Sequence, residues 1–133
     1  MKYTTVKESK VLLKLGLKLE SADMHYLVIG DDKYSEYPQL GNLGNTIKEL
    51  PCWSGDRLLD LLPAKLSNGN YKIDLREDSE GYFQIAYGSW NSSYTRFNDM
   101  INTKQSQNFK EVCYDMLIWL LKNKKEEVVY DYN

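Results

Sequence analysis

The chain has 133 residues and a formal net charge of −2, and it is 42% hydrophobic and 27% charged. This length predicts a single domain over residues 1–133, large enough to bury a hydrophobic core without disulfide bonds or a structural metal. The slightly acidic charge argues against a nucleic-acid-binding protein, because the neutralisation of phosphates requires clustered lysine and arginine.

Cysteine usage and the length of the apolar runs indicate a cytoplasmic protein that does not associate with a membrane. Cys52 and Cys113 are too few for a disulfide framework, although a bond between them stays open at this point. We expect reduced thiols in a reducing compartment. Residues 1–5 lack the apolar segment of a signal peptide, and the longest apolar run, residues 116–121, is too short to cross a bilayer.

The first predicted helix begins after Thr5 and stops at Gly16. Thr5 and Glu8 have the spacing of a capping box, in which each residue satisfies a backbone N–H near the other. Gly16 favours the left-handed conformation that ends a helix, which folds Leu17 back onto Leu12.

A short strand and an irregular connection follow this helix. Residues 26–29 are rich in β-branched and aromatic side chains, which predicts a strand, and the turn-forming residues 30–32 end it. Residues 34–45 show no period, because glycine, proline and asparagine interrupt them. Long connections of this kind in compact domains are often functional or mobile.

The second predicted helix begins at a well-formed cap. Ser54 is the expected N-cap, and Asp56 lies in the first turn, where the helix dipole favours negative charge. Trp53 is placed to pack on Leu58 across the cap, as in a hydrophobic staple. Pro63 ends the helix, because its ring clashes with a continuing turn.

Alternating polar and apolar residues then predict a β-hairpin. It spans about residues 71–87, and its turn is the acidic segment 77–81. Every second side chain of the first strand is apolar, which is typical of a half-buried strand. Residues 88–93 predict a loop, and residues 94–97 a third strand.

The most apolar segment of the chain, residues 108–122, predicts a core helix. At about 100° per residue, five apolar side chains form one stripe, and further apolar residues widen it on both sides. Such a helix has to be covered over most of its circumference. Asn108 and Glu111 have the spacing of a capping box. The stripe consists of Phe109, Val112, Cys113, Met116 and Leu120.

These elements predict an α+β fold in which three helices pack on a small antiparallel sheet built around the hairpin at residues 71–87. The end of the chain is left open. Residues 124–133 either fray or pair through residues 128–130 as a late strand.

A set of short motifs carries a family resemblance. In chain order they are Leu13-Lys14-Leu15-Gly16-Leu17, Ser21-Ala22-Asp23-Met24, Cys52-Trp53-Ser54, Leu58-Leu59-Asp60-Leu61-Leu62-Pro63, Ala86-Tyr87-Gly88 and Met116-Leu117-Ile118-Trp119-Leu120-Leu121. Their order and spacing, over roughly residues 11–123, resemble a group of small proteins encoded by phages and mobile elements of gut Bacteroidetes. The resemblance implies such an origin and a cytosolic host compartment. It implies no activity and no catalytic residue, since none is known for the group.

His25 and Cys52 are the residues on which catalysis or metal binding would depend. A zinc site needs three or four ligands, and the sequence offers no second histidine and no cysteine pair at ligand spacing. Cys52 would become a nucleophile if the amides at the start of the second helix lowered its pKa, whereas the competing interpretation is a small residue packed under Trp53. No motif favours catalysis, so the sequence predicts no catalytic residue, metal or cofactor.

Aromatic residues in loops indicate a recognition surface. The chain has 11 tyrosines and 3 tryptophans, and both residue types are enriched at protein interfaces because they combine a large apolar area with a polar tip. The competing interpretation is that tyrosines cover the sheet edges. The loop candidates are Tyr34, Tyr37, Trp90 and Tyr94.

Ile118 is the remaining candidate. It lies beside the polar strip of the last helix, nearly opposite Phe109. If Ile118 is exposed near Tyr114 and Leu121, it marks a patch for self-association or for a partner. If the hairpin and the first two helices cover both sides of the helix, Ile118 belongs to the core.

The leading hypothesis is a non-enzymatic cytoplasmic protein that binds another protein, or itself as a homodimer. A small enzyme with an unrecognised active site and a structural homo-oligomer are the alternatives. A cleft lined by convergent polar groups with shifted pKa values would favour the enzyme, and the mass in solution would reveal the oligomer.

Overall fold

The computed structural model describes residues 2–41, 49–66 and 69–130. Its helices are α1 (Val6–Lys14), η1 (Leu19–Ser21), α2 (Gly55–Asp60), α3 (Phe109–Asn123) and η2 (Lys125–Glu127). Its strands are β1 (Met24–Gly30), β2 (Lys33–Tyr34), β3 (Gln39–Leu40), β4 (Glu49–Cys52), β5 (Lys72–Glu77), β6 (Phe83–Trp90) and β7 (Phe97–Asn102). Among the described residues, no helix combines the length and the apolar character that crossing a membrane requires.

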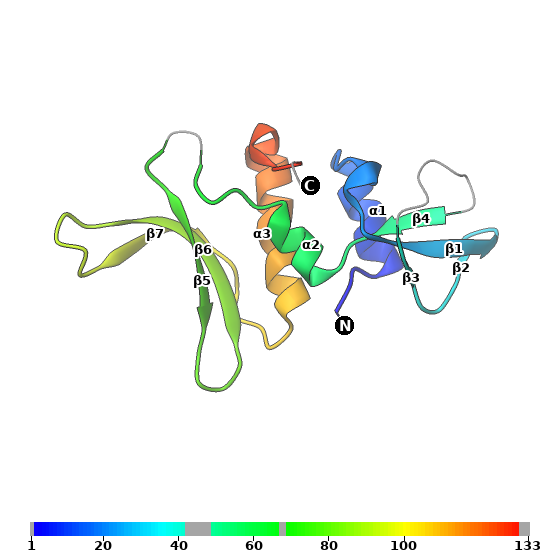
Figure 1. The fold of residues 1–133 in the computed structure, drawn as a ribbon, viewed down its shortest axis with the longest axis horizontal. Helices are drawn as coiled ribbons and strands as arrows, with labels where there is room; N and C mark the ends of the chain where they lie inside the picture. Colours follow the sequence, from blue (N-terminus) through cyan, green and yellow to red (C-terminus); the bar gives the residue numbers. More distant parts are fainter. Residues whose placement is uncertain (1, 42–48, 67–68, 131–133) are drawn as a thin grey trace.

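The helices lie between two antiparallel sheets that form the ends of an elongated molecule (Figure 1). The first sheet contains β1 to β4 and lies beside α1. The second has the order β5-β6-β7 and lies beside α3 and α2. The α+β class is confirmed, but the sequence predicted one small sheet around the hairpin and only a single strand of the other sheet.

In the first sheet, β1 is the central strand and pairs antiparallel with β2, β3 and β4. α1 packs on this sheet and buries a small core around Tyr26, Leu50 and Cys52. The segment predicted to be irregular, residues 34–45, contains β3 and the end of β2, and its residues 42–45 lie outside the described part of the chain.

The second sheet contains the predicted hairpin, formed by β5 and β6, and adds β7 as its third strand. Two predictions about its far end were wrong. The loop predicted at residues 88–93 starts later, because β6 continues through Trp90. The third strand, predicted at residues 94–97, begins only at Phe97, and Tyr94 lies in the preceding turn with a φ of 56°.

Gly88 explains the misplaced loop. In the sequence, a glycine followed by serines and asparagine is typical of a loop. In the structure Gly88 is a buried strand residue, and a Cβ at this position would come closer than 3.0 Å to Asn98 and to the ring of Phe97. The glycine therefore permits the close approach of β7 to β6.

α3 lies between the second sheet and the other helices, and most of its predicted stripe is buried; Phe109 is half-buried. Its cap differs from the prediction. The Asn108 side chain accepts a hydrogen bond from the Lys110 N–H at 3.1 Å, but Glu111 accepts one from the Ser106 hydroxyl at 2.9 Å. The Asn108 N–H donates to that same hydroxyl at 3.0 Å, so Ser106 takes the place of Glu111 in the capping box. The fully buried stripe residues are Val112, Cys113, Met116 and Leu120.

The ends of the shorter helices follow their predicted caps. Thr5 and Glu8 form the capping box, with bonds of 3.1 and 2.9 Å. The Leu17 N–H donates to the Leu12 carbonyl at 3.0 Å, which is the predicted folding back at the end of α1. Ser54 caps α2 by accepting the N–H three residues later at 3.1 Å.

The described part of the C-terminal segment is docked on the helices. After η2, Val128 is buried in the main core, and the Val129 N–H donates to the Leu61 carbonyl at 2.9 Å. Residues 128–130 belong to no strand. Residues 131–133 lie outside the described part of the chain.

Candidate functional site

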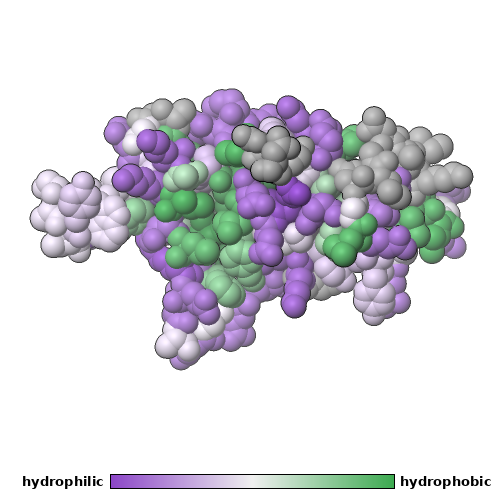
Figure 2. Space-filling model, viewed as in Figure 1, coloured by the Kyte–Doolittle hydropathy of each residue, from purple (hydrophilic) through white to green (hydrophobic). Residues whose placement is uncertain are grey.

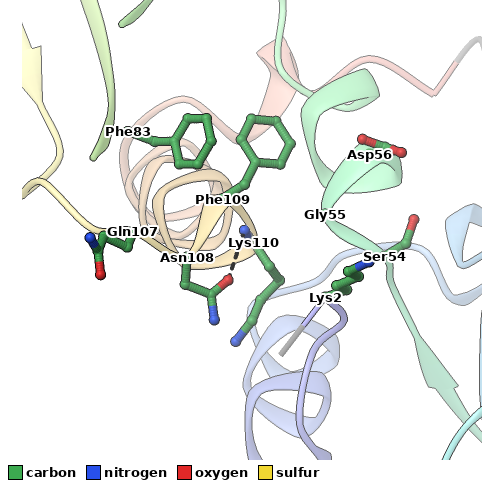
Figure 3. Close-up of a pocket in the computed structure, with 9 residues that line it drawn as sticks. All are labelled: Lys2, Ser54, Gly55, Asp56, Phe83, Gln107, Asn108, Phe109 and Lys110. Carbon is green, nitrogen blue, oxygen red and sulfur yellow. Dashed lines mark hydrogen bonds between the residues drawn. The ribbon is translucent and has the colours of Figure 1, made fainter. Parts of the chain in front are cut away.

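A cleft of about 710 Å³ opens where the first turns of α2 and α3 meet the start of β6 (Figure 3). Residues 54–56 form one wall and residues 107–110 the other, while Phe83 contributes to the floor and Lys2 to the rim. The site therefore combines segments that are far apart in the sequence.

Backbone pairing brings the two phenylalanines of the floor together. The Phe83 N–H donates to the Ser106 carbonyl at 2.7 Å, and the Ser106 N–H donates back at 3.0 Å, so the segment before α3 runs along β6. α3 begins three residues later with Phe109. Its ring meets that of Phe83 edge to face, with ring centroids 5.3 Å apart and an interplanar angle of 70°.

Gly55 allows the wall formed by α2 to approach α3 closely. A Cβ at this position would lie 3.3 Å from the Lys110 Cα and 3.3 Å from the Phe109 ring. The Gly55 N–H donates to the Lys2 carbonyl at 3.0 Å, which fixes the N-terminal segment against the same wall.

Most polar groups behind the cleft are already paired. Lys110 is only 4% exposed, and its Nζ lies 2.6 Å from Oε1 of Glu8 on α1. The side chains of Ser54 and Asn108 cap the first amides of their helices. The cleft thus has an apolar floor, and the side chains of Ser54, Asn108 and Lys110 in its walls are paired, an arrangement that suits the burial of an apolar group from a partner.

A further exposed apolar residue, Leu75, lies beside the cleft on the edge strand β5. Leu75 is 45% exposed. It lies on the same face of the sheet as Phe83, because Leu75 pairs with Ile85 and Glu77 pairs with Phe83. Figure 2 shows an apolar area over β5 and β6, beside the helices.

The four aromatic residues predicted to form a recognition surface lie at opposite ends of the molecule (Figure 1). Tyr34 and Tyr37 belong to the first sheet and the segment after β2, and Tyr34 is half-buried. Trp90 and Tyr94 lie at the end of β6 and in the turn before β7, where Trp90 packs edge to face on Phe97 at 5.4 Å. The structure does not bring the four together into one surface.

Ile118 is half-buried and packs against the main core. The residues expected to accompany it in an exposed patch are less accessible than that hypothesis required, since Tyr114 is half-buried and Leu121 is 5% exposed. The position fits a residue at the margin of the core.

Cys52 and His25 do not form a nucleophilic pair. Met24 pairs with Cys52 and His25 is the next residue, so the two side chains lie on opposite faces of the sheet. Burial raises the pKa of the Cys52 thiol to about 11 and that of Cys113 to about 12. The amides of α2 therefore do not activate Cys52 in the way that the nucleophile hypothesis required.

His25 is buried with one ring nitrogen in use. Its Nδ1 lies 2.7 Å from the Gly41 carbonyl, which accepts only, so we assign the ring proton to Nδ1. Nε2 has no hydrogen-bond partner among the described residues. Within the same residues, no group of three or more potential ligands is arranged to hold a metal ion.

The apolar residues of the cleft, and Leu75 beside it, were not singled out by the sequence as a site. Phe109 was predicted as core, and Phe83 and Leu75 as strand residues. Their type and spacing are those of buried positions, so no local signal separates them from core residues. Phe83 and Phe109 come together only where α2, α3 and β6 meet.

The chain matches no protein-family model, no curated protein and no solved structure. The resemblance to proteins of phages and mobile elements therefore stays a prediction. The candidate function rests on the geometry of the cleft.

Proposed function

We propose that this protein acts by binding another protein, and that the cleft and the adjoining apolar face of β5 form its binding surface. The observation that carries the proposal is the apolar floor of Phe83 and Phe109, with the exposed Leu75 on the same face of the sheet as Phe83. Contiguous exposed apolar surface of this kind is typical of interaction sites.

The chemistry of the described residues favours binding over catalysis. Both thiols have raised pKa values, and Lys110 is paired with Glu8. The groups that shape the cleft hold the backbone in place and leave an apolar floor for a partner side chain.

We also propose a cytoplasmic location and a phage or mobile-element origin. Support for the location comes from the two cysteines, which are both free and buried, as in a reducing compartment. The origin rests on the sequence resemblance alone.

Affinity capture with a matched pair of variants tests the proposal. The protein is immobilised and exposed to a lysate of the organism that carries the gene, and retained proteins are quantified by mass spectrometry. Leu75→Ser removes apolar area beside the cleft. Ile29→Ser is the control, because Ile29 is 66% exposed on the opposite sheet.

We expect a partner that the unmodified protein and Ile29→Ser retain equally and that Leu75→Ser retains several-fold less. A partner retained equally by Leu75→Ser, or lost only with Ile29→Ser, would contradict the proposed surface. Sedimentation of the purified protein distinguishes a foreign partner from a second copy of the chain.

A further inference from the structure

One carboxylate of α2 lines the apolar cleft, and two more lie beside it on the hairpin of β5 and β6. Asp56 lies in the first turn of α2 and lines the cleft directly. Glu77 is directly opposite Phe83 in the sheet. Glu80 lies in the following turn, and its backbone carbonyl accepts a hydrogen bond from the Gln107 side chain. All three side chains are exposed.

These carboxylates have no cation to neutralise them in the described part of the chain. None of their oxygens takes part in a hydrogen bond or ion pair there. Lys110 is committed to Glu8. Among the residues that line the cleft, Lys2 and Lys110 are the cations, and only Lys2 is unpaired, so it alone stands against Asp56 on the lining and Glu77 and Glu80 on the neighbouring hairpin.

We propose that the occupant of the cleft is a basic amphipathic segment of a partner protein. Apolar side chains of the segment enter the cleft against Phe83 and Phe109 and extend over Leu75. Lysine or arginine side chains beside them reach the carboxylates of Asp56, Glu77 and Glu80. This inference rests on the proposed function and deepens it by stating the chemistry of the partner.

The apolar and the basic side chains of such a segment have distinct physical roles. Burial of apolar side chains supplies most of the affinity, because it removes apolar area from water on both partners. The rim carboxylates select the sign of the partner's charge and raise its association rate, an effect that salt screens. An acidic segment would meet like charge at the same rim.

Three synthetic peptides test the charge and the apolar requirement separately. The first alternates leucine or phenylalanine with lysine. The second replaces every lysine by glutamate, and the third replaces every apolar residue by serine. Binding to the full chain is measured by titration calorimetry at low and at high salt. We expect binding of the first peptide alone, weakened by salt.

Charge variants of the protein then locate the effect. We expect Asp56→Asn and Glu77→Gln each to weaken binding of the basic peptide about three-fold, the range of exposed ion pairs. Lys2→Gln is expected to strengthen it slightly, since it removes the opposing cation. Asp31→Asn and Glu36→Gln, exposed positions in the connections between strands of the first sheet, are the matched controls and should change nothing.

The outcomes separate this inference from the proposed function. Failure of the basic peptide to bind, equal or tighter binding of the acidic peptide, or insensitivity to both rim variants overturns the inference. If Leu75→Ser still reduces capture of a partner several-fold, the binding surface stands and only the partner's charge is wrong. A dimer that Leu75→Ser dissociates would identify a second copy as the occupant instead and would also overturn the inference.

Discussion

Cys52 illustrates how burial removes reactivity from a residue that looks reactive in the sequence. Its Sγ donates to the Thr4 carbonyl at 3.3 Å, and the Thr4 hydroxyl bonds in turn to the Ser9 hydroxyl at 2.8 Å and to the Trp53 N–H at 3.1 Å. Thr4, Ser9, Cys52 and Trp53 are all inaccessible to solvent. The thiol thus belongs to a satisfied network that fixes the N-terminal segment to β4.

We therefore expect neither thiol to react in the folded protein. Burial raises the pKa values of Cys52 and Cys113 to about 11 and about 12, so the thiolate is scarce at pH 8 and the sulfur is shielded. Labelling with an aromatic disulfide reagent at pH 8 should detect no thiol before denaturation and both thiols after it. Rapid labelling of Cys52 under native conditions would contradict this account.

At the scale of residues, local chemistry predicted most helix ends correctly. The caps at Thr5, Gly16 and Ser54 depend on neighbours within a few positions, which the sequence displays. Glu111 was misassigned because its partner, Ser106, is held in place by pairing with Phe83. That pairing joins residues distant in the chain, and the sequence carries no sign of it.

At the scale of elements, the ion pair between Glu8 and Lys110 joins α1 to α3. Glu8→Gln retains a residue that completes the capping box but leaves a buried ammonium without its counter-charge. We expect this variant to lose about 3 kcal/mol of unfolding free energy, measured by urea denaturation. Lys110→Met fills a similar volume without charge and should cost less, because the Glu8 carboxylate that it leaves is 20% exposed and still accepts a hydrogen bond from the Thr5 N–H.

The unfolding free energies of these two variants show whether the ion pair stabilises the fold through its charges. Equal losses for Glu8→Gln and Lys110→Met would show that the pair contributes mainly through contact area. A negligible loss for Glu8→Gln would show that Lys110 is solvated, in contradiction to its 4% exposure.

Arg76 and Asp99 join β5 to β7 across the outer face of the second sheet. Arg76 holds Asp99 through two hydrogen bonds of 2.5 and 3.1 Å, and these bonds lower the pKa of Asp99. A carboxyl whose pKa is lower in the folded state stabilises the fold above its unfolded pKa of about 3.9 and loses that contribution as the pH falls through the folded pKa.

Asp99→Asn should therefore reduce stability at neutral pH by at most about 1 kcal/mol, since the pair is partly exposed. The difference from the unmodified protein should shrink as the pH falls below about 4. Thermal unfolding between pH 2 and pH 7 measures both effects, with Asp31→Asn as the exposed control. A constant difference over this range would mean that the ion pair is not its cause.

The elements that the sequence missed are the short ones. β2 and β3 have two residues each, and β4 has four, including Pro51. Segments of this length show no measurable period, and proline argues against a strand. They form strands because β1, which was predicted, offers both of its edges for pairing.

At the scale of the whole molecule, function depends on the junction between elements. α2, α3 and β6 were each predicted near their observed positions, yet the cleft exists only because Gly55 allows two helices to approach and Ser106 aligns α3 with β6. Local sequence patterns predict the helices and strands but not the junction at which they form the cleft. The aromatic residues that the sequence predicted as a recognition surface lie instead at the two far ends.

The most direct test of the central claim is a map of where a partner touches the protein. Amide resonances of the isotope-labelled full chain are followed by nuclear magnetic resonance during titration with the basic amphipathic peptide. The account predicts that the largest shifts occur at Leu75, Phe83 and Phe109. Shifts centred on Tyr34 and Tyr37 or on Trp90 and Tyr94, or no shifts at any position, would contradict it.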